Sequence, residues 1–104
     1  MIIVAGWVRL LDANEVDRFR AAAIEMMRAT KAQETGCLEY AFATDLADPA
    51  LLHVVERWTD QGALSAHFTT PHMALFQREM ANARIASMSV KAYSGEVVRT
   101  LMER

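Results

Sequence analysis

The sequence predicts an α+β domain in which a four-stranded antiparallel sheet carries helices on one face. Three observations lead to this fold class. The chain opens with an apolar, β-branched run, a helical stripe follows it, and two strand-like runs then precede a second helical region and a final strand. A length of 104 residues without linkers, repeats or low-complexity segments indicates one domain over residues 1–104.

The first strand is expected over residues 2–11 and the first helix after it. Along the strand Val4 and Val8 share one face, while Ile3 and Trp7 share the other. Asp12 or Asn14 is a suitable N-cap for the helix. Its apolar stripe consists of Val16, Phe19, Ala23, Met26 and Thr30. Gly36 suits the position after the helix, where it is free to adopt a positive φ.

Two strands should follow, over residues 37–44 and 51–58, with Asp48 and Pro49 in the turn between them. Asp60 is expected to cap a short helix that ends near His67. Thr70 and Pro71 are typical of an N-cap and a first helical residue. They predict a helix that runs to about residue 86, with an apolar face of Leu75, Phe76, Met80 and Ala83.

The last strand is expected over residues 89–98, with Gly95 marking a bulge or bend. The order is then β-α-β-β-α-β, the split βαβ arrangement of ferredoxin-like domains, with both helical regions on one face of the sheet. The other face carries apolar residues and no helix remains to cover it. We therefore expect a homodimer joined through the sheets.

Composition excludes several classes of protein. The net charge is −2 and no block of like charge occurs, so neither nucleic acid nor a membrane is an expected partner. No apolar run approaches the ~18 residues of a membrane span. The single cysteine, Cys37, cannot form an internal disulfide, and the N-terminal segment does not resemble a signal peptide. A cytoplasmic location is the resulting expectation.

The candidate catalytic residues are Glu56 and His67. Glu56 and Trp58 are two residues apart on one strand and therefore share a face. Burial between sheet and helices would raise the pKa of Glu56 toward that of a useful base. The alternative is a structural role, in which a partly buried Glu56 pairs with an arginine or caps a helix. His67 could act as a base or bind a substrate oxyanion, or its ring could satisfy carbonyl groups at the helix end.

Four further residues are candidates for substrate binding. Trp58 could also be a core residue under the short helix, and Tyr40 could supply a hydroxyl group or pack across the strands. His72 shares a helical face with Phe76, which suits a pocket wall or a satisfied core histidine. His53 should point to the opposite face of the sheet from Glu56.

No cofactor or metal site is expected. The spacings of the three histidines match no usual ligand pattern, and His53 faces away from the others. The chain has no glycine-rich phosphate loop, no dinucleotide fingerprint and no Cys-x-x-Cys pair. A packed thiol is the default interpretation of Cys37.

Several short motifs, in this order and spacing, resemble the antibiotic biosynthesis monooxygenase family, in particular its quinol-monooxygenase-like branch within the dimeric α+β barrel superfamily. The resemblance covers nearly the whole chain. The motifs are Gly36–Tyr40, Asp48-Pro49, Glu56-x-Trp58, Ala63-Leu64, His67, Thr70-Pro71-His72 and Phe76.

The resemblance implies a homodimer with a pocket between sheet and helices in each subunit. It further implies a monooxygenase that needs no cofactor and acts on a small aromatic or quinol-like molecule and dioxygen. Once such a substrate is deprotonated, it is electron-rich enough to react with oxygen itself, and the protein positions it and takes its proton. His67 and Glu56 would serve that transfer, with Trp58 and Tyr40 shaping an apolar wall.

Other members of the family fit the sequence less well. Haem-degrading members carry a haem-ligating histidine where this chain has Gln77, and a pocket tryptophan where it has His67. Isomerase-like members act on sugar phosphates and carry a first-helix histidine near the position of Met27. Two alternatives to the monooxygenase remain open, a sugar-phosphate isomerase-like enzyme and a non-catalytic dimeric module that binds a small hydrophobic molecule.

Overall fold

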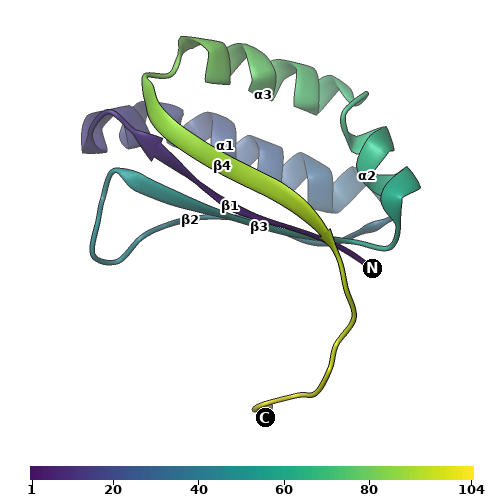
Figure 1. Ribbon diagram of the computed structural model, residues 1–104. Helices are drawn as coiled ribbons and strands as arrows, with labels where there is room; N and C mark the ends of the chain where they lie inside the picture. Colours follow the sequence, from purple (N-terminus) through teal and green to yellow (C-terminus); the bar gives the residue numbers. More distant parts are fainter.

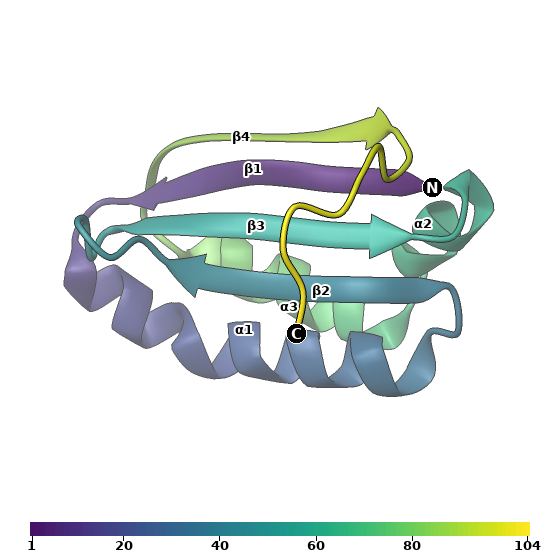
Figure 2. The same cartoon turned by 90° about the horizontal axis from the view of Figure 1, so that it is seen from below.

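The computed structural model describes residues 1–104. It contains β1 (Ile2–Leu10), α1 (Ala13–Gln33), β2 (Cys37–Thr44), β3 (Leu51–Trp58), α2 (Gln61–His67), α3 (Pro71–Asn82) and β4 (Ile85–Ser94). The strands form one antiparallel sheet in the order β2-β3-β1-β4. All three helices lie on the same side of this sheet (Figure 1), and Figure 2 shows the bare opposite face. The predicted ferredoxin-like fold is confirmed.

Each helix begins where its capping residue predicts. The Asp12 side chain accepts a hydrogen bond from the backbone N–H of Glu15, and Asp60 accepts one from Ala63. Thr70 accepts one from the backbone N–H of Met73, and Pro71 follows as the first residue of α3. These bonds satisfy N–H groups that have no partner inside the helix, which explains why the sequence predicts helix starts so well.

The core lies between the sheet and the helices. All five residues of the predicted α1 stripe are buried, and they pack against the inward residues of the strands. Along β3 the buried residues alternate with more exposed ones, as expected for a sheet with one covered face. The core cluster comprises Ile2, Val4, Val8, Leu10, Val16, Phe19, Ala23, Met26, Tyr40, Leu52, Val54, Trp58 and Phe76.

The predicted boundary between the last helix and the last strand is wrong by four residues. The helix ends at Asn82, and β4 begins at Ile85 because Leu10 pairs with it and the Leu11 N–H donates to the Arg84 carbonyl. The prediction placed the helix end too late because Met80 and Ala83 keep the apolar spacing of a helix, although α3 ends at Asn82. Leu75, expected on the apolar face, is 55% exposed. The strand irregularity falls at Arg9 and Leu10, not at Gly95.

The structure does not confirm the positive φ expected at Gly36. No glycine in the chain has a positive φ, and α1 ends through an extended Glu34. What Gly36 provides is space, since a Cβ atom there would lie 2.4 Å from the Cβ of Ala63. The absence of a side chain lets the loop before β2 approach α2 closely.

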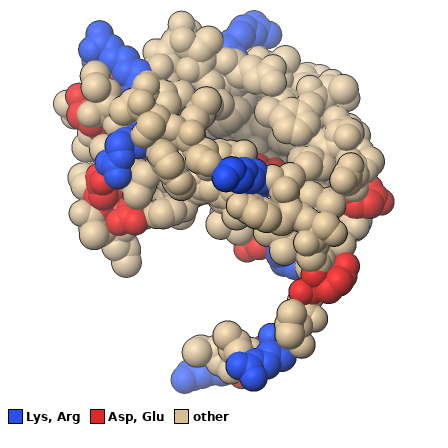
Figure 3. All heavy atoms as spheres, viewed as in Figure 1, with Lys and Arg blue, Asp and Glu red and all other residues tan.

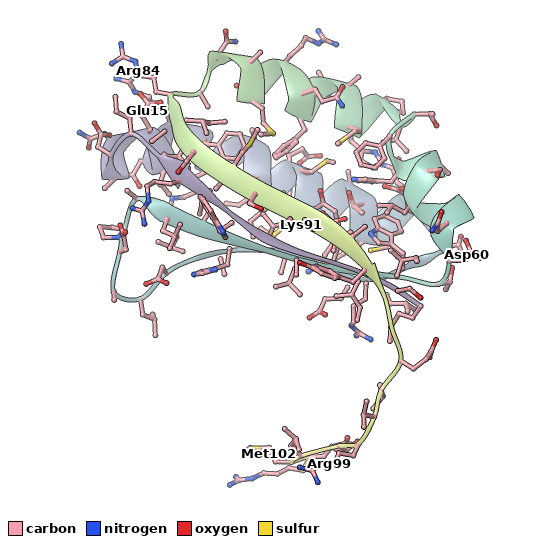
Figure 4. All side chains as sticks on the ribbon, in the orientation of Figure 1. Glu15, Asp60, Arg84, Lys91, Arg99 and Met102 are labelled. Carbon is pink, nitrogen blue, oxygen red and sulfur yellow. The ribbon has the colours of Figure 1, made fainter.

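The sheet face without helices is partly apolar. Trp7, Val55 and Tyr93 are exposed on it or beside it. Beyond β4 the chain leaves the domain on this side of the sheet, and the segment that carries Arg99 and Met102 lies away from the body (Figures 1 and 4). Val98, Leu101 and Met102 are almost fully exposed there. None of the helices is long and apolar enough to cross a membrane.

Replacing Gly36 by alanine should destabilise the fold by about 1–3 kcal/mol, the usual cost of overpacking. Gly62→Ala is the matched control, because the new Cβ atom would meet only the Asp60 carboxylate at 3.3 Å. The control should change the free energy of unfolding by less than about 1 kcal/mol. Urea denaturation of the two variants measures both values. Equal stability of the two would contradict a packing requirement at Gly36.

Candidate functional site

A cavity of about 400 Å³ lies between the sheet and the helices. Fifteen of its eighteen lining residues are hydrophobic, and they come from β1, β2, β3 and β4 below and from α1, α2 and α3 above. Figure 3 shows the surface hollowed between α3 and β4, where the cavity opens. Its volume is within the range of small-molecule sites. The polar lining residues are Glu56, His67 and Lys91.

Beside this cavity, two imidazoles, those of His67 and His72, form hydrogen bonds to one carboxylate, that of Glu34. The Oε2 atom of Glu34 lies 2.7 Å from Nδ1 of His67 and 2.6 Å from Nε2 of His72. Glu34 follows α1, His67 ends α2 and His72 is in the first turn of α3, so the three side chains join all three helices. All three are largely buried.

This arrangement defines which nitrogen of His67 carries the hydrogen. An ionised carboxylate only accepts hydrogen bonds, so Nδ1 of His67 donates to Glu34. In the neutral ring Nε2 then has a free lone pair. It is the only buried side-chain nitrogen or oxygen without a hydrogen-bond partner. His67 is 1% exposed and is one of the residues that line the cavity.

Aromatic rings hold the His67 imidazole in place. Its ring centroid lies 4.9 Å from that of Trp58 and 5.3 Å from that of Tyr40. The alternative that the ring satisfies carbonyl groups at the end of α2 is not what is observed. Thr70 fulfils that task instead, because its hydroxyl donates to the carbonyl of His67.

Glu56 lines the same cavity and is held by the indole of Trp58, whose Nε1–H donates to Oε1 at 2.9 Å. No arginine pairs with it. Burial raises the pKa of Glu56, the Trp58 hydrogen bond partly offsets this, and the charge of Glu34 adds to it. The carboxyl group therefore keeps its proton to a higher pH than an exposed glutamate does.

Tyr40 and Phe76 also line the cavity. Tyr40 lies directly opposite Glu56 in the β2–β3 pair. Burial, with the charges of Glu56 and Glu34, raises the pKa of Tyr40, so that the group remains a neutral phenol. Phe76 stacks on Phe42 with ring centroids 5.4 Å apart and forms part of the wall.

Two of the residues expected to bind substrate do not line this cavity. Trp58 is completely buried beneath His67 and reaches the cavity only through its bond to Glu56. His72 lies behind Glu34 and lines a separate groove between α1 and α3. His53 points to the opposite sheet face, as expected, and bonds Asp45. Burial raises the pKa of the Cys37 thiol, which argues against a reactive thiolate.

Sequence reasoning missed Glu34, the residue that connects the two histidines. A signal for it does exist in the helical spacing. The buried stripe of α1 ends at Thr30, and the next position on that face, four residues on, is Glu34. A charged residue at the end of an apolar stripe must meet a polar partner if it is buried.

Glu34, His67 and His72 are also the only three side chains placed to share a metal ion, with their ligand atoms within 4.8 Å of one another. The carboxylate oxygen, however, lies at hydrogen-bond distance from both nitrogens. Neighbouring ligands in a tetrahedral shell with bonds of about 2.0–2.2 Å stand roughly 3.3 Å apart. The observed spacing is that of a hydrogen-bonded triad.

Replacing Glu56 by glutamine should change how stability depends on pH. The raised pKa means that the folded state binds this proton more tightly than the unfolded state, whose value is the ordinary 4.5. Wild-type stability from this group is therefore complete below that pH and is lost as pH rises through the folded-state pKa. Glutamine does not titrate and still accepts from Trp58.

The free energy of unfolding of Glu56→Gln should gain on that of the wild type as the pH rises above the ordinary value of 4.5. Urea titrations at a series of pH values measure the difference. Glu103→Gln in the exposed C-terminal segment is the control and should show no such gain. A constant difference between Glu56→Gln and wild type would mean that the carboxyl group is not desolvated.

Known proteins with the same architecture agree with this description. The family model described as antibiotic biosynthesis monooxygenase matches residues 1–79. A candidate antibiotic biosynthesis monooxygenase from Deinococcus radiodurans has a TM-score of 0.87 at 24% identity, covering 99% of this chain and 100% of that one. A similar candidate from Caulobacter crescentus CB15 has a TM-score of 0.83 at 18% identity, with coverages of 92% and 90%.

A conserved protein from Methanosarcina mazei Go1 shares the fold at a TM-score of 0.81 and 21% identity, covering 91% of this chain and 92% of that one. No curated protein matches the sequence. Identities this low establish the shared fold only, but the family model spans most of the chain. The protein belongs to the antibiotic biosynthesis monooxygenase family.

Proposed function

We propose that the protein is a cofactor-independent monooxygenase that oxygenates a small phenol or hydroquinone with dioxygen. The observation that supports this most directly is the unpartnered Nε2 of His67, a residue that lines an apolar cavity. A buried nitrogen without a partner is costly unless a ligand completes it. A phenolic O–H is a hydrogen-bond donor on an apolar body, so it would give Nε2 a partner while its ring packs against the apolar wall.

In the proposed first step Nε2 of His67 takes the phenolic proton. The Glu34 carboxylate, bonded to Nδ1, orients the ring and stabilises the imidazolium that forms. The surrounding apolar side chains keep water away from the resulting phenolate. His72 shares the same carboxylate oxygen and holds Glu34 in position.

The second step is the reaction of the phenolate with dioxygen. A C–O bond forms between a ring carbon and dioxygen, and loss of that carbon's hydrogen cleaves the O–O bond and releases water. For a hydroquinone the sum is substrate plus O₂ giving hydroxyquinone plus water. The substrate supplies all four electrons, so no external reductant or metal is required by the balance.

Glu56 suits a supporting task in this scheme. Burial raises the pKa of its carboxyl group, so Glu56 is a weaker acid than an exposed glutamate and, in its protonated form, can donate a hydrogen bond to a substrate oxygen. Sequence reasoning left open whether His67 or Glu56 is the base. The bond between His67 and Glu34 favours His67, because a base needs a partner that stabilises its charged form.

The lining of the cavity also bears on the two alternatives. A sugar phosphate needs several polar contacts and a cationic phosphate site, whereas fifteen of eighteen lining residues are hydrophobic and only one, Lys91, is a permanent cation. An apolar aromatic therefore fits better than an isomerase substrate. A non-catalytic binding module would use the same cavity, and oxygen consumption distinguishes it from the monooxygenase.

We also infer that the protein is a homodimer. Trp7, Val55 and Tyr93 leave apolar surface on the sheet face that no helix covers, and the apolar residues beyond β4 lie on the same side. A second copy of the sheet is the simplest cover for this surface, and it would close a barrel around the two sheets.

His67→Ala should lower turnover of an accepted hydroquinone by about 10²–10⁴-fold, the usual contribution of a positioned base. Glu34→Gln should fall between this variant and the wild type, because it keeps the space but removes the charge that stabilises the imidazolium. An oxygen electrode with a panel of hydroquinones measures the turnover of both variants and of the wild type.

His53→Ala is the matched control, since His53 lies on the other sheet face, and it should keep full activity. His72→Ala should lose more stability than turnover. Full activity in His67→Ala would mean that Glu56 is the base or that the substrate ionises without one. If no compound causes oxygen uptake, the monooxygenase hypothesis is rejected in favour of the non-catalytic binding module.

Val55→Glu should convert a dimer into a monomer, because it places a charge in the middle of the sheet face proposed to be covered. Leu46→Glu is the control, since Leu46 is fully exposed in the β2–β3 turn and should leave the dimer intact. Light scattering at micromolar concentration gives the mass. A monomeric wild type would contradict the proposed dimer.

A further inference from the structure

The hydrogen-bonded triad of Glu34, His67 and His72 connects two different hollows of the protein. His67 lines the cavity between sheet and helices, whereas His72 lines a groove of about 600 Å³ between α1 and α3. His67 is 1% exposed and His72 is 9% exposed. Of the two imidazoles, His72 is therefore the one with more access to solvent, and that access lies at the groove.

One carboxylate serves both imidazoles. Oε2 of Glu34 lies 2.7 Å from Nδ1 of His67 and 2.6 Å from Nε2 of His72, and the two ring centroids are 6.0 Å apart. A single imidazolium beside the ionised carboxylate leaves this buried cluster with no net charge. Two imidazolium rings would leave it positive and would repel each other. A proton on one ring therefore opposes a proton on the other.

The charges around the groove favour the proton on His72. Nε2 of His72 is bonded to Glu34, so an added proton would go to Nδ1. Three charged residues line the groove with His72: Arg18, Glu25 and Glu79. Arg18 is paired with Glu15, and Glu25 is paired with Arg28. Glu79 takes part in none of the ion pairs, so its negative charge is left to favour a charged His72.

The groups on the cavity side add little charge beside His67. Burial raises the pKa of Tyr40 and of Glu56, so both resist becoming anions. Burial and the charge of Glu34 likewise raise the pKa of the Cys37 thiol. Lys31 in the last turn of α1 is exposed, where solvent screens its charge.

We propose that His72 keeps His67 free to act as a base. His72 takes up a proton from the groove and holds the one positive charge that Glu34 can balance, which opposes protonation of His67 by solvent. When a substrate gives its proton to Nε2 of His67, the positive charge moves to that ring and His72 releases its own proton into the groove.

The step balances without a proton crossing Glu34. A phenol, neutral His67 and charged His72 become a phenolate, charged His67, neutral His72 and a proton in solvent, and Glu34 stays ionised throughout. His72 is thus a positioning residue that acts through Glu34. The proposal rests on the proposed function for the source of the substrate proton, but competition between the two rings is a property of the protein alone and needs no turnover.

Nuclear magnetic resonance of protein labelled with ¹⁵N-histidine tests the competition, because ring nitrogen shifts distinguish the two neutral tautomers from the imidazolium. As the pH of the wild type is lowered, His72 should gain a proton first and His67 only at lower pH. The His67 signals should also move during the His72 step. His53, on the other face of the sheet, is the internal reference and should titrate in one step.

His72→Gln keeps an N–H donor for Glu34 but cannot carry a charge. It should raise the proton affinity of His67 about ten-fold or more, because a like charge within about 6 Å is removed. Glu34→Gln should lower the proton affinity of both rings, since it removes the charge they share. His53→Gln is the matched control and should leave the titration of His67 and His72 unchanged.

Several results would overturn the inference. These are independent titration of His67 and His72 in the wild type, protonation of His67 before His72, no protonation of His72 before the protein unfolds, or an unchanged His67 in His72→Gln. The wild-type titration decides the matter if a variant does not fold. Competition without oxygen uptake would remove only the monooxygenase, and oxygen uptake without competition would remove only the assignment of His72.

Discussion

The shared carboxylate of Glu34 is the interaction on which the candidate site depends. One buried oxygen atom accepts a hydrogen bond from His67 and another from His72, and so connects the ends of three helices. A buried carboxylate is costly without such partners, and each imidazole is oriented by the bond it donates. The same contact therefore contributes to helix packing and leaves Nε2 of His67 free at the cavity.

The cavity combines a wide apolar wall with few polar groups, and this contrast determines what it can do. In an apolar site each charge interacts more strongly than in water, so a single base has a large effect. Glu56 illustrates the point, because burial raises the pKa of its carboxyl group, while the indole of Trp58 fixes the orientation of that group. The substrate itself would then supply the reactivity toward dioxygen, and the protein would position the substrate.

Much of the fold could be predicted because local signals agree with it. The caps Asp12, Asp60 and Thr70 and the α1 stripe depend on neighbours within a few residues. The start of β4 depends instead on pairing with β1, more than seventy residues away, which no local pattern contains. The site follows the same division. His67 and Glu56 could be selected by residue type, whereas Glu34 gains its position only from packing between distant elements.

The pairing of β1 with β4 has a consequence for how the domain is made. Ile2 lies opposite Ser94, and the N–H of Gly95 donates to the carbonyl of Met1, so the first and last strands are neighbours in space. During synthesis β1 has its β3 partner early, but its other edge stays open until β4 leaves the ribosome. One wall of the cavity is thus translated after the other walls, and the site can assemble only once the three other strands and the helices already exist.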